Sequence, residues 1–305
     1  MTPITLTAPA KVNLFLRVLA REASGYHGIE TLFCRISLAD TLTVAAAEGR
    51  SGVQLTSEGE DCGPPAENLA TRAAQLVLAA TGAQTGVALH LVKQIPSKAG
   101  LGGGSSDAAA ALLGTNQLLG NPVPRHELMQ LASRLGADVP FFVSGASLAL
   151  GWDRGDRLFT LPSLPSAPGL LIVPPVGVST AEAYRWVDGV RAEAGRRGAV
   201  ALDAESVASW GSVARMAGND FEGAVFGKEP KVREAFEKLV STQPLVCRMS
   251  GSGSALFAIY RHAGAREACV EPVHRTSFYA VSNGMIRPHF LPSCNRASSR
   301  APAFR

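Results

Sequence analysis

Residues 98–113 read KAGLGGGSSDAAAALL, with four glycines in five residues directly before two serines, an aspartate and a run of alanines. Glycine adopts positive φ readily and allows another molecule to approach the main chain. Ser105 or Ser106 is a natural N-cap, and Asp107 suits the first turn of a helix. The segment therefore predicts a glycine loop that leads into a helix N-terminus, where free N–H groups bind phosphate.

An exposed glycine turn followed by an ordinary capping signal explains the same residues. Two familiar phosphate loops are excluded. No Gly-Lys-Ser/Thr tripeptide closes the loop, as Walker A requires, and the glycines lack the G-x-G-x-x-G spacing of dinucleotide-binding folds. A nucleotide bound here would be held by a loop of another type.

The composition predicts an ordinary cytoplasmic protein. The chain has 305 residues, of which 46% are hydrophobic, enough for one large or two smaller domains. It contains no run of 18 apolar residues and no basic start typical of a signal peptide. The cysteines form no C-x-x-C pair, which argues against a disulfide framework and a zinc site; they are Cys34, Cys62, Cys247, Cys269 and Cys294.

The charge distribution predicts neither a nucleic-acid partner nor a membrane partner. Residues 261–305 hold seven arginines, no lysine and two glutamates, so the formal net charge of +4 arises there and the rest of the chain is nearly neutral. We expect a monomer or homodimer that acts on a small molecule.

Hydrophobic patterns predict a mixture of strands and helices, with a domain boundary near the proline-rich segment 161–168, LPSLPSAP, and a small α/β sandwich after it. Before it, we expect strands at 11–18, 31–36, 42–46, 53–56 and 87–92, and helices at 68–80, 106–119 and 125–135. After it, we expect strands at 169–173, 245–249, 255–260 and 277–281, and helices at 180–186, 231–242 and 263–270.

Two further features carry polar groups in apolar surroundings. Lys11 and Asn13 lie two residues apart in an apolar strand and so share one face; a lysine there either guards a sheet edge or points into a polar cleft. Asp138 follows Gly136 in GADVPFF, between a helix and an apolar segment. A turn or N-cap aspartate explains it equally well.

Seven sequence motifs occur in order between positions 9 and 260. They are PAKVNLFLRV, GYHGIETLF, IPSKAGLGGGSSDAAAALL, GADVPFF, GVSTAEAY, NDFE and MSGSGSALFAIY. Together they resemble the galactokinase–homoserine kinase–mevalonate kinase–phosphomevalonate kinase (GHMP) superfamily. The resemblance implies an α+β N-terminal ATP-binding domain, a ferredoxin-like C-terminal domain and an active site in the cleft between them. We assign these domains to residues 1–162 and 163–285, and expect 286–305 to form a flexible tail.

The resemblance also implies a reaction, the transfer of the ATP γ-phosphoryl group to the 2-hydroxyl of a cytidine-diphosphate-linked methylerythritol. This is a step of non-mevalonate isoprenoid precursor synthesis. An alcohol is a poor nucleophile, so a carboxylate that accepts its proton assists, and we expect Asp138 to be this base. Lys11 is expected beside Asp138, where it stabilises the developing negative charge.

The remaining site residues follow from the same resemblance. ATP is the cosubstrate with Mg²⁺, for which no acidic pair near the loop is an obvious ligand. Tyr26 and Tyr184 would stack on the cytosine and His27 would hydrogen-bond its edge, while an exposed hairpin tip is the simpler explanation for Tyr26 and His27. Asn13 and Thr180 are expected on the substrate side. The expected ATP-binding residues are Asn68, which is equally a helix cap, and Ser97, Lys98, Ala99, Gly100, Leu101, Gly102, Gly103, Gly104, Ser105 and Ser106.

Three alternatives stay open. The chain could be another small-molecule kinase of the homoserine or mevalonate type. Those substrates, however, carry no base that the segments GYH (25–27) and AEAY (181–184) could bind. It could be a lyase resembling diphosphomevalonate decarboxylase, which product analysis distinguishes. It could also be a non-catalytic relative, which has no chemical need for Lys11, Asp138 and the glycine loop together.

Overall fold

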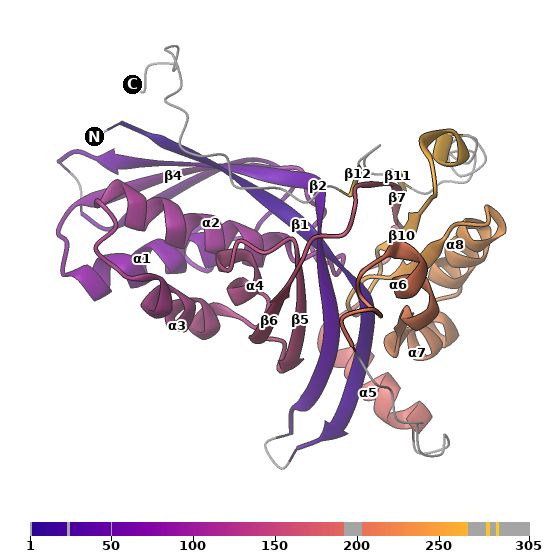
Figure 1. The fold of residues 1–305 in the computed structure, drawn as a ribbon. Helices are drawn as coiled ribbons and strands as arrows, with labels where there is room; N and C mark the ends of the chain where they lie inside the picture. The colour runs from indigo at the N-terminus through magenta and orange to yellow at the C-terminus, as the bar shows by residue number, and fades with distance from the viewer. Residues whose placement is uncertain are drawn as a thin grey trace.

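The computed structural model describes residues 2–22, 25–49, 51–191, 203–267, 279–280 and 285–286. Within them the chain forms two β-sheets, each packed against its own set of helices (Figure 1). The long β1–β2 pair runs between the two helical groups. The predicted α+β, two-domain architecture is confirmed.

The N-terminal sheet is built around two unusually long antiparallel strands, β1 (Ile4–Arg21) and β2 (His27–Ala47). The sheet order is β3-β4-β2-β1-β8, with β5 paired to β2 and β6 paired to β5. The other strands are β3 (Val53–Gly59), β4 (Gly86–Lys93), β5 (Leu148–Asp153), β6 (Arg157–Leu161) and β8 (Gly218–Asn219).

The prediction of two separate strands at 31–36 and 42–46 is wrong, because β2 continues through both. Asp40 lies between them, and an aspartate in that position is a common turn signal. Its fully buried carboxylate instead binds the ammonium of Lys93 and accepts the main-chain N–H of Ile95 at 2.8 Å. These contacts satisfy the carboxylate inside the sheet, so the strand does not turn.

Four helices pack against this sheet and form its core, namely α1 (Leu69–Thr81), α2 (Gly103–Leu118), α3 (Arg125–Leu135) and α4 (Val139–Val143). The central helix α2 approaches the sheet closely at Gly114. A Cβ there would lie 2.7 Å from Leu6 Cδ1 and 2.7 Å from Val44 Cγ2. The small residues of α2 therefore bring its N-terminus, and the glycine loop before it, close to the middle of β1, where the N–H of Lys11 donates to the Leu101 carbonyl at 2.9 Å.

The second sheet has the order β11-β7-β10-β9, with β12 also paired to β7. Its strands are β7 (Ala167–Val173), β9 (Val246–Met249), β10 (Leu256–Ile259), β11 (Tyr279–Ala280) and β12 (Met285–Ile286). The helices of this half are α5 (Thr180–Arg191), α6 (Trp210–Met216), α7 (Phe221–Lys228) and α8 (Pro230–Ser241).

Most predicted elements of the second half are confirmed within two residues, although α5 runs five residues beyond its predicted end. The predicted helix 263–270 is helical over 263–267, and its last three residues lie outside the described part of the chain. Ile286 belongs to β12, and the rest of the predicted tail lies outside the described residues. Elements α4, β5, β6, α6, β8, α7 and β12 were not expected from the sequence.

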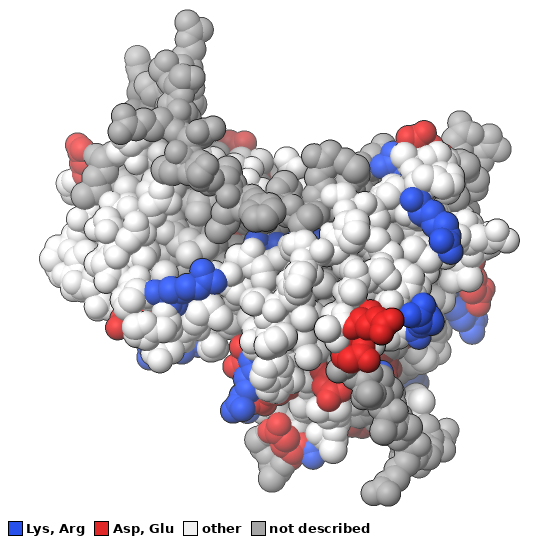
Figure 2. All heavy atoms as spheres, viewed as in Figure 1, with Lys and Arg blue, Asp and Glu red and all other residues white. Residues whose placement is uncertain are grey.

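No described helix combines the length and apolar character needed to cross a membrane. On the face shown in Figure 2, the Lys and Arg side chains of the described residues lie scattered and interspersed with Asp and Glu. This face therefore carries no continuous basic surface among the residues that are described.

Glu222 at the start of α7 links this helix to the second sheet. Its Oε1 accepts the main-chain N–H of Met249 at 2.8 Å, and its Oε2 lies 4.0 Å from Arg248 Nη1. Burial raises the pKa of Glu222 from 4.5 to about 7 despite these partners. The folded protein therefore binds more protons at Glu222 than the unfolded chain does between these two pH values.

This linkage gives a sign for the pH dependence of stability. Because the folded-state pKa is raised, the free energy of unfolding should fall as pH rises from 4.5 to 7. Glu222→Gln keeps the acceptor for Met249 but carries no charge, so the fall should shrink by about 1–3 kcal/mol. Urea unfolding at pH 5 and pH 7.5 measures the decrease in the free energy of unfolding for wild type, Glu222→Gln and an exposed control, Glu237→Gln. The same decrease in Glu222→Gln as in the control would contradict this linkage.

Candidate active site

Lys11 on β1 is a buried ammonium surrounded by polar groups from three segments of the chain. Its Nζ lies 2.8 Å from Asn13 Oδ1, 3.0 Å from the carbonyl oxygen of Gly100 and 3.4 Å from Asp138 Oδ2. The side chain is only 4% exposed. Burying an ammonium is costly unless it is paired and hydrogen-bonded, and these contacts meet that need. The fold therefore buries Lys11 among polar groups, and β1 lies between β2 and β8 and not at a sheet edge.

Asp138 lies at the N-terminal end of the short helix α4, whose early Pro140 fixes the start of the helix. The carboxylate makes no capping hydrogen bond to that helix and its side chain is 29% exposed. It is thus held near Lys11 while one side stays accessible to a ligand. The expected proximity of Lys11 and Asp138, 127 residues apart in sequence, is what the structure shows.

Asn13 joins Lys11 to the second domain. Its Oδ1 also accepts the main-chain N–H of Gly251 at 2.9 Å, and its Nδ2 donates to Thr31 Oγ1 at 2.8 Å. The residue is 2% exposed. These contacts make Asn13 a link between the domains; its expected role in binding substrate stays a prediction.

The glycine loop and the turn SGSGS at 250–254 pack backbone against backbone. A Cβ on Gly100, whose φ is +78°, would lie 2.1 Å from the carbonyl oxygen of Ser250. Ser250 Oγ donates to the Gly100 carbonyl at 2.9 Å, and the N–H of Ala255 donates to the Ala99 carbonyl at 3.1 Å. Glycine is thus required at position 100 by both φ and the close approach.

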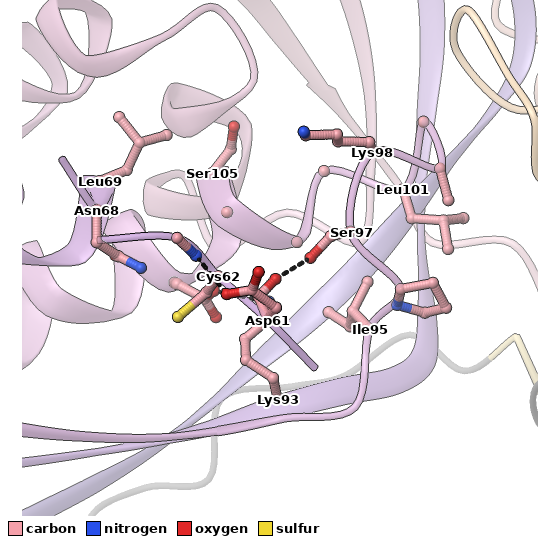
Figure 3. Close-up of a pocket in the computed structure, with 18 of the residues that line it drawn as sticks. Asp61, Cys62, Asn68, Leu69, Lys93, Ile95, Ser97, Lys98, Leu101 and Ser105 are labelled. Carbon is pink, nitrogen blue, oxygen red and sulfur yellow. Dashed lines mark hydrogen bonds and ion pairs between the residues drawn. The ribbon is translucent and has the colours of Figure 1, made fainter. Parts of the chain in front are cut away.

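A cavity of about 480 Å³ lies beside this loop (Figure 3). In that view Asn68 and Leu69 lie on one side, and Ser97, Lys98 and Leu101 on the other. The loop residues that line it are Ser97, Lys98, Ala99, Gly100, Leu101, Gly102, Gly103, Gly104 and Ser105, joined by Asn68, Leu69, Asp61, Cys62, Gly63, Glu67, Lys93, Ile95, Pro96 and Asp107. The cavity has the size of a small-molecule site. Asn68 both caps α1 and lines the cavity.

The helix after the loop begins earlier than predicted. Gly102, with φ 70°, is the N-cap of α2, and the N–H of Ser106 already bonds the Gly102 carbonyl at 2.9 Å. The prediction that Ser105 or Ser106 is the N-cap is therefore wrong. The first-turn N–H groups of Gly103, Gly104 and Ser105 have no partner within the helix, as an anion site requires, and the binding of an anion there stays a prediction. Ser106 is buried and does not line the cavity.

Beneath the loop lies a buried charge cluster that sequence reasoning missed. Lys93 Nζ binds the carboxylates of Asp40 and of Asp107, the latter at 2.8 Å. Asp107 Oδ1 has no hydrogen-bond partner, and burial, partly opposed by Lys93, raises the pKa of Asp107 to about 7. Because α2 starts at Gly103, Asp107 lies just after its first turn and not within it as expected. The cluster fixes the end of β4 to the N-terminal part of α2, and thus both ends of the loop. Its only sequence signals are a lysine that ends an apolar strand and an aspartate before alanines.

The residues expected on the substrate side lie near the junction of β2 and α5. His27 and Tyr184 stack with ring centroids 4.9 Å apart, while Tyr26 is 59% exposed with the Arg154 guanidinium 4.3 Å from its ring. Tyr184 also makes a T-shaped contact with Phe221, so both His27 and Phe221 pack against its ring, and its expected stacking on cytosine stays a prediction.

Tyr184 connects these aromatic residues to the Lys11–Asp138 pair. Burial raises its pKa, and the charge of Asp138 raises it further, so the phenol lies within electrostatic reach of that carboxylate. At the start of α5, Thr180 Oγ1 lies 3.1 Å from Ser252 Oγ in the glycine–serine turn. Helix α5 thus meets the glycine–serine turn, whose Ser250 in turn contacts the glycine loop.

Comparisons with known proteins agree with this geometry. The model of the GHMP kinases N-terminal domain matches residues 68–146, and that of the GHMP kinases C-terminal domain matches residues 180–280. A 4-diphosphocytidyl-2-C-methyl-D-erythritol kinase of Solibacter usitatus is 39% identical over 91% of this chain and 87% of its own length. One of Geobacter sulfurreducens is 37% identical over 92% and 99%. A crystal structure of 4-(cytidine 5'-diphospho)-2C-methyl-D-erythritol kinase is 36% identical, covers 92% of this chain and 98% of its own, and superposes with a TM-score of 0.75.

The packing at Gly100 yields a test of the loop. Gly100→Ala places a methyl group against the Ser250 main chain, which cannot give way as a flexible side chain can. We expect nucleotide affinity to fall at least about tenfold, which corresponds to about 1.4 kcal/mol. Titration with a fluorescent ATP analogue measures this. Gly223→Ala, where a Cβ meets nothing within 4 Å, is the control; equal affinities for the two variants would refute the close-packing account.

Proposed function

We infer that this chain, which belongs to the GHMP kinase family, transfers the γ-phosphoryl group of ATP to the 2-hydroxyl of 4-diphosphocytidyl-2-C-methyl-D-erythritol. The reaction is a step of non-mevalonate isoprenoid precursor synthesis. The observation that carries this inference is the Lys11–Asp138 pair, 3.4 Å apart and adjoining the glycine loop that lines the nucleotide-sized cavity. The relatives of 37–39% identity over most of the chain support the choice of acceptor.

Asp138 acts as the general base in this proposal. Its accessible carboxylate oxygen accepts the proton of the 2-hydroxyl as that oxygen forms a bond to the γ-phosphorus, and the bond to the ADP oxygen breaks. Because phosphoryl transfer needs little covalent chemistry from the protein, the position of the base relative to the γ-phosphate is the main contribution. Asp138 suits this role because Lys11 holds its carboxylate at 3.4 Å and no helix cap competes for it.

Lys11 supplies positive charge at the point of transfer. Its ammonium has two neutral oxygen acceptors, on Asn13 and Gly100, and one carboxylate partner. The partners of Lys11 are fixed before substrate arrives, so stabilising negative charge in the transition state requires little reorganisation.

The glycine loop is proposed to bind the ATP phosphates through main-chain N–H groups at the start of α2. Mg²⁺ is expected with ATP, and it would neutralise phosphate charge when bound. The described residues contain no cluster of three or more His, Cys, Asp or Glu side chains suited to a metal ion. The side chains in the described part of the chain thus do not form a metal cage of that kind.

The cytosine is proposed to bind at Tyr26, His27 and Tyr184, with Thr180 and Asn13 on the side of the alcohol. Tyr26 is the exposed ring of this group and is therefore the one available for stacking. A homoserine or mevalonate acceptor has no base to use these rings. We also propose a cytoplasmic location, where ATP is available; a monomer or homodimer without nucleic-acid partners stays a prediction.

The proposal predicts a separation of chemistry from binding in Asp138→Asn. We expect kcat to fall about 10²- to 10⁴-fold because the base is lost, while ATP affinity and the unfolding midpoint stay close to wild type. Steady-state kinetics with the cytidine substrate, nucleotide titration and thermal unfolding measure the three quantities. Asp156→Asn, in the β5–β6 turn, serves as the control. Wild-type turnover in Asp138→Asn would refute the base assignment.

A further inference from the structure

His27 at the start of β2 is held by a carboxylate that comes from the other half of the molecule. His27 Nε2 lies 2.7 Å from Asp188 Oδ1 on α5, 161 residues away in sequence. The His27 side chain is 5% exposed, whereas that of Asp188 is 38% exposed. The imidazole is therefore largely buried, whereas its carboxylate partner is partly open to solvent.

The plane of the imidazole is fixed by the same helix. Tyr184, one helical turn before Asp188, stacks on His27 with an interplanar angle of 15°. Helix α5 thus supplies both the ring that sets the plane of His27 and the carboxylate that binds its Nε2. Two constraints from one rigid element leave His27 little freedom to rotate.

The hydrogen bond to Asp188 also determines where the imidazole carries its proton. A carboxylate only accepts hydrogen bonds, so the proton of a neutral His27 lies on Nε2 and the lone pair lies on Nδ1. Among the described residues, His27 Nδ1 has no hydrogen-bond partner. It is therefore available as an acceptor at the site proposed for the base.

Cytosine and uracil differ at the position that such an acceptor can distinguish. Cytosine carries a 4-amino donor where uracil carries a 4-oxo acceptor. The lone pair of His27 Nδ1 can accept a hydrogen bond from the 4-amino group of cytosine. With uracil, the same lone pair would face a lone pair of the 4-oxo group, and the two would repel each other. A site built to accept one hydrogen bond penalises the base that cannot donate it.

We propose that Asp188 is a specificity-determining positioning residue, which keeps the proton of His27 on Nε2 so that Nδ1 accepts a hydrogen bond from the 4-amino group of cytosine. This rests on the proposed function, because it assumes that the acceptor alcohol carries cytidine diphosphate. Asp188 acts through His27 and does not touch the base. Its role is the choice of base, distinct from the phosphoryl transfer at Asp138.

The test compares Asp188→Asn, Asp188→Ala and wild type in kcat/KM for the acceptor alcohol linked to cytidine diphosphate or to uridine diphosphate. We expect wild type to prefer cytidine by about 100-fold or more. The amide introduced by Asp188→Asn can donate to Nε2, which moves the imidazole proton to Nδ1, so this variant should reduce the preference at least about tenfold. Asp188→Ala leaves the tautomer unconstrained and should give a smaller reduction. The KM for ATP should not change.

A spectroscopic measurement separates this role from a merely structural one. Long-range ¹H–¹⁵N correlations of the histidine imidazoles should show the Nε2–H tautomer of His27 in wild type and Nδ1–H in Asp188→Asn, with a His27→Gln sample for assignment. If both Asp188 variants keep the wild-type preference for cytidine, Asp188 does not determine the choice of base. The same conclusion follows if His27 has the same tautomer in Asp188→Asn as in wild type. Either result leaves the proposed kinase activity standing.

The failure of the proposed function has a different signature. If wild-type protein phosphorylates neither the cytidine-linked nor the uridine-linked alcohol, the proposed function is wrong. If it phosphorylates both equally well, the site does not distinguish the bases. In both cases the proposed role of Asp188 is also wrong. Tyr26→Ala serves as the comparison within the site. Stacking tolerates any base, so it should weaken both substrates and leave their ratio unchanged.

Discussion

The buried ammonium of Lys11 is the constraint on which the rest of the site depends. A charge that is 4% exposed needs partners, and those partners come from β1, the glycine loop and the start of α4. Asn13 then extends the same network to Gly251 in the second domain. Satisfying one cation thus brings together Asp138, the loop and the glycine–serine turn, which come from separate parts of the sequence.

A second buried cation, Lys93, supports the same loop from below. Lys93 and Asp107 connect β4 to α2, while Asp40 holds the main chain of Ile95 just after the strand. The loop itself is rich in glycine and has little intrinsic preference for one conformation. Its geometry is therefore imposed by neighbours: the charge cluster at its ends and the Ser250 turn against Gly100.

Local patterns predicted much of this site. The alternation of strand side chains predicted that Lys11 and Asn13 share a face, and they lie 2.8 Å apart. The glycines and alanines predicted the loop and α2, although the cap fell at Gly102 because a glycine with positive φ starts the helix before the serines. Contacts between distant segments were not predictable in this way. Asp40 gives a turn signal locally but is paired with Lys93 in the fold. Asp188 is one of two acidic residues on α5, and nothing in the local sequence indicates that it contacts His27.

The central claim is that the two domains join a phosphate loop to a base-reading pocket around one Lys–Asp pair. Phosphorus NMR of the purified protein with ATP tests it most directly, using the cytidine-diphospho-methylerythritol alcohol, methylerythritol phosphate, homoserine, mevalonate and diphosphomevalonate as separate acceptors. The account predicts ADP and an equal amount of a new phosphomonoester with the cytidine alcohol alone. Phosphorylation of another alcohol in preference to it, release of carbon dioxide from diphosphomevalonate, or no turnover of the cytidine alcohol would contradict the account.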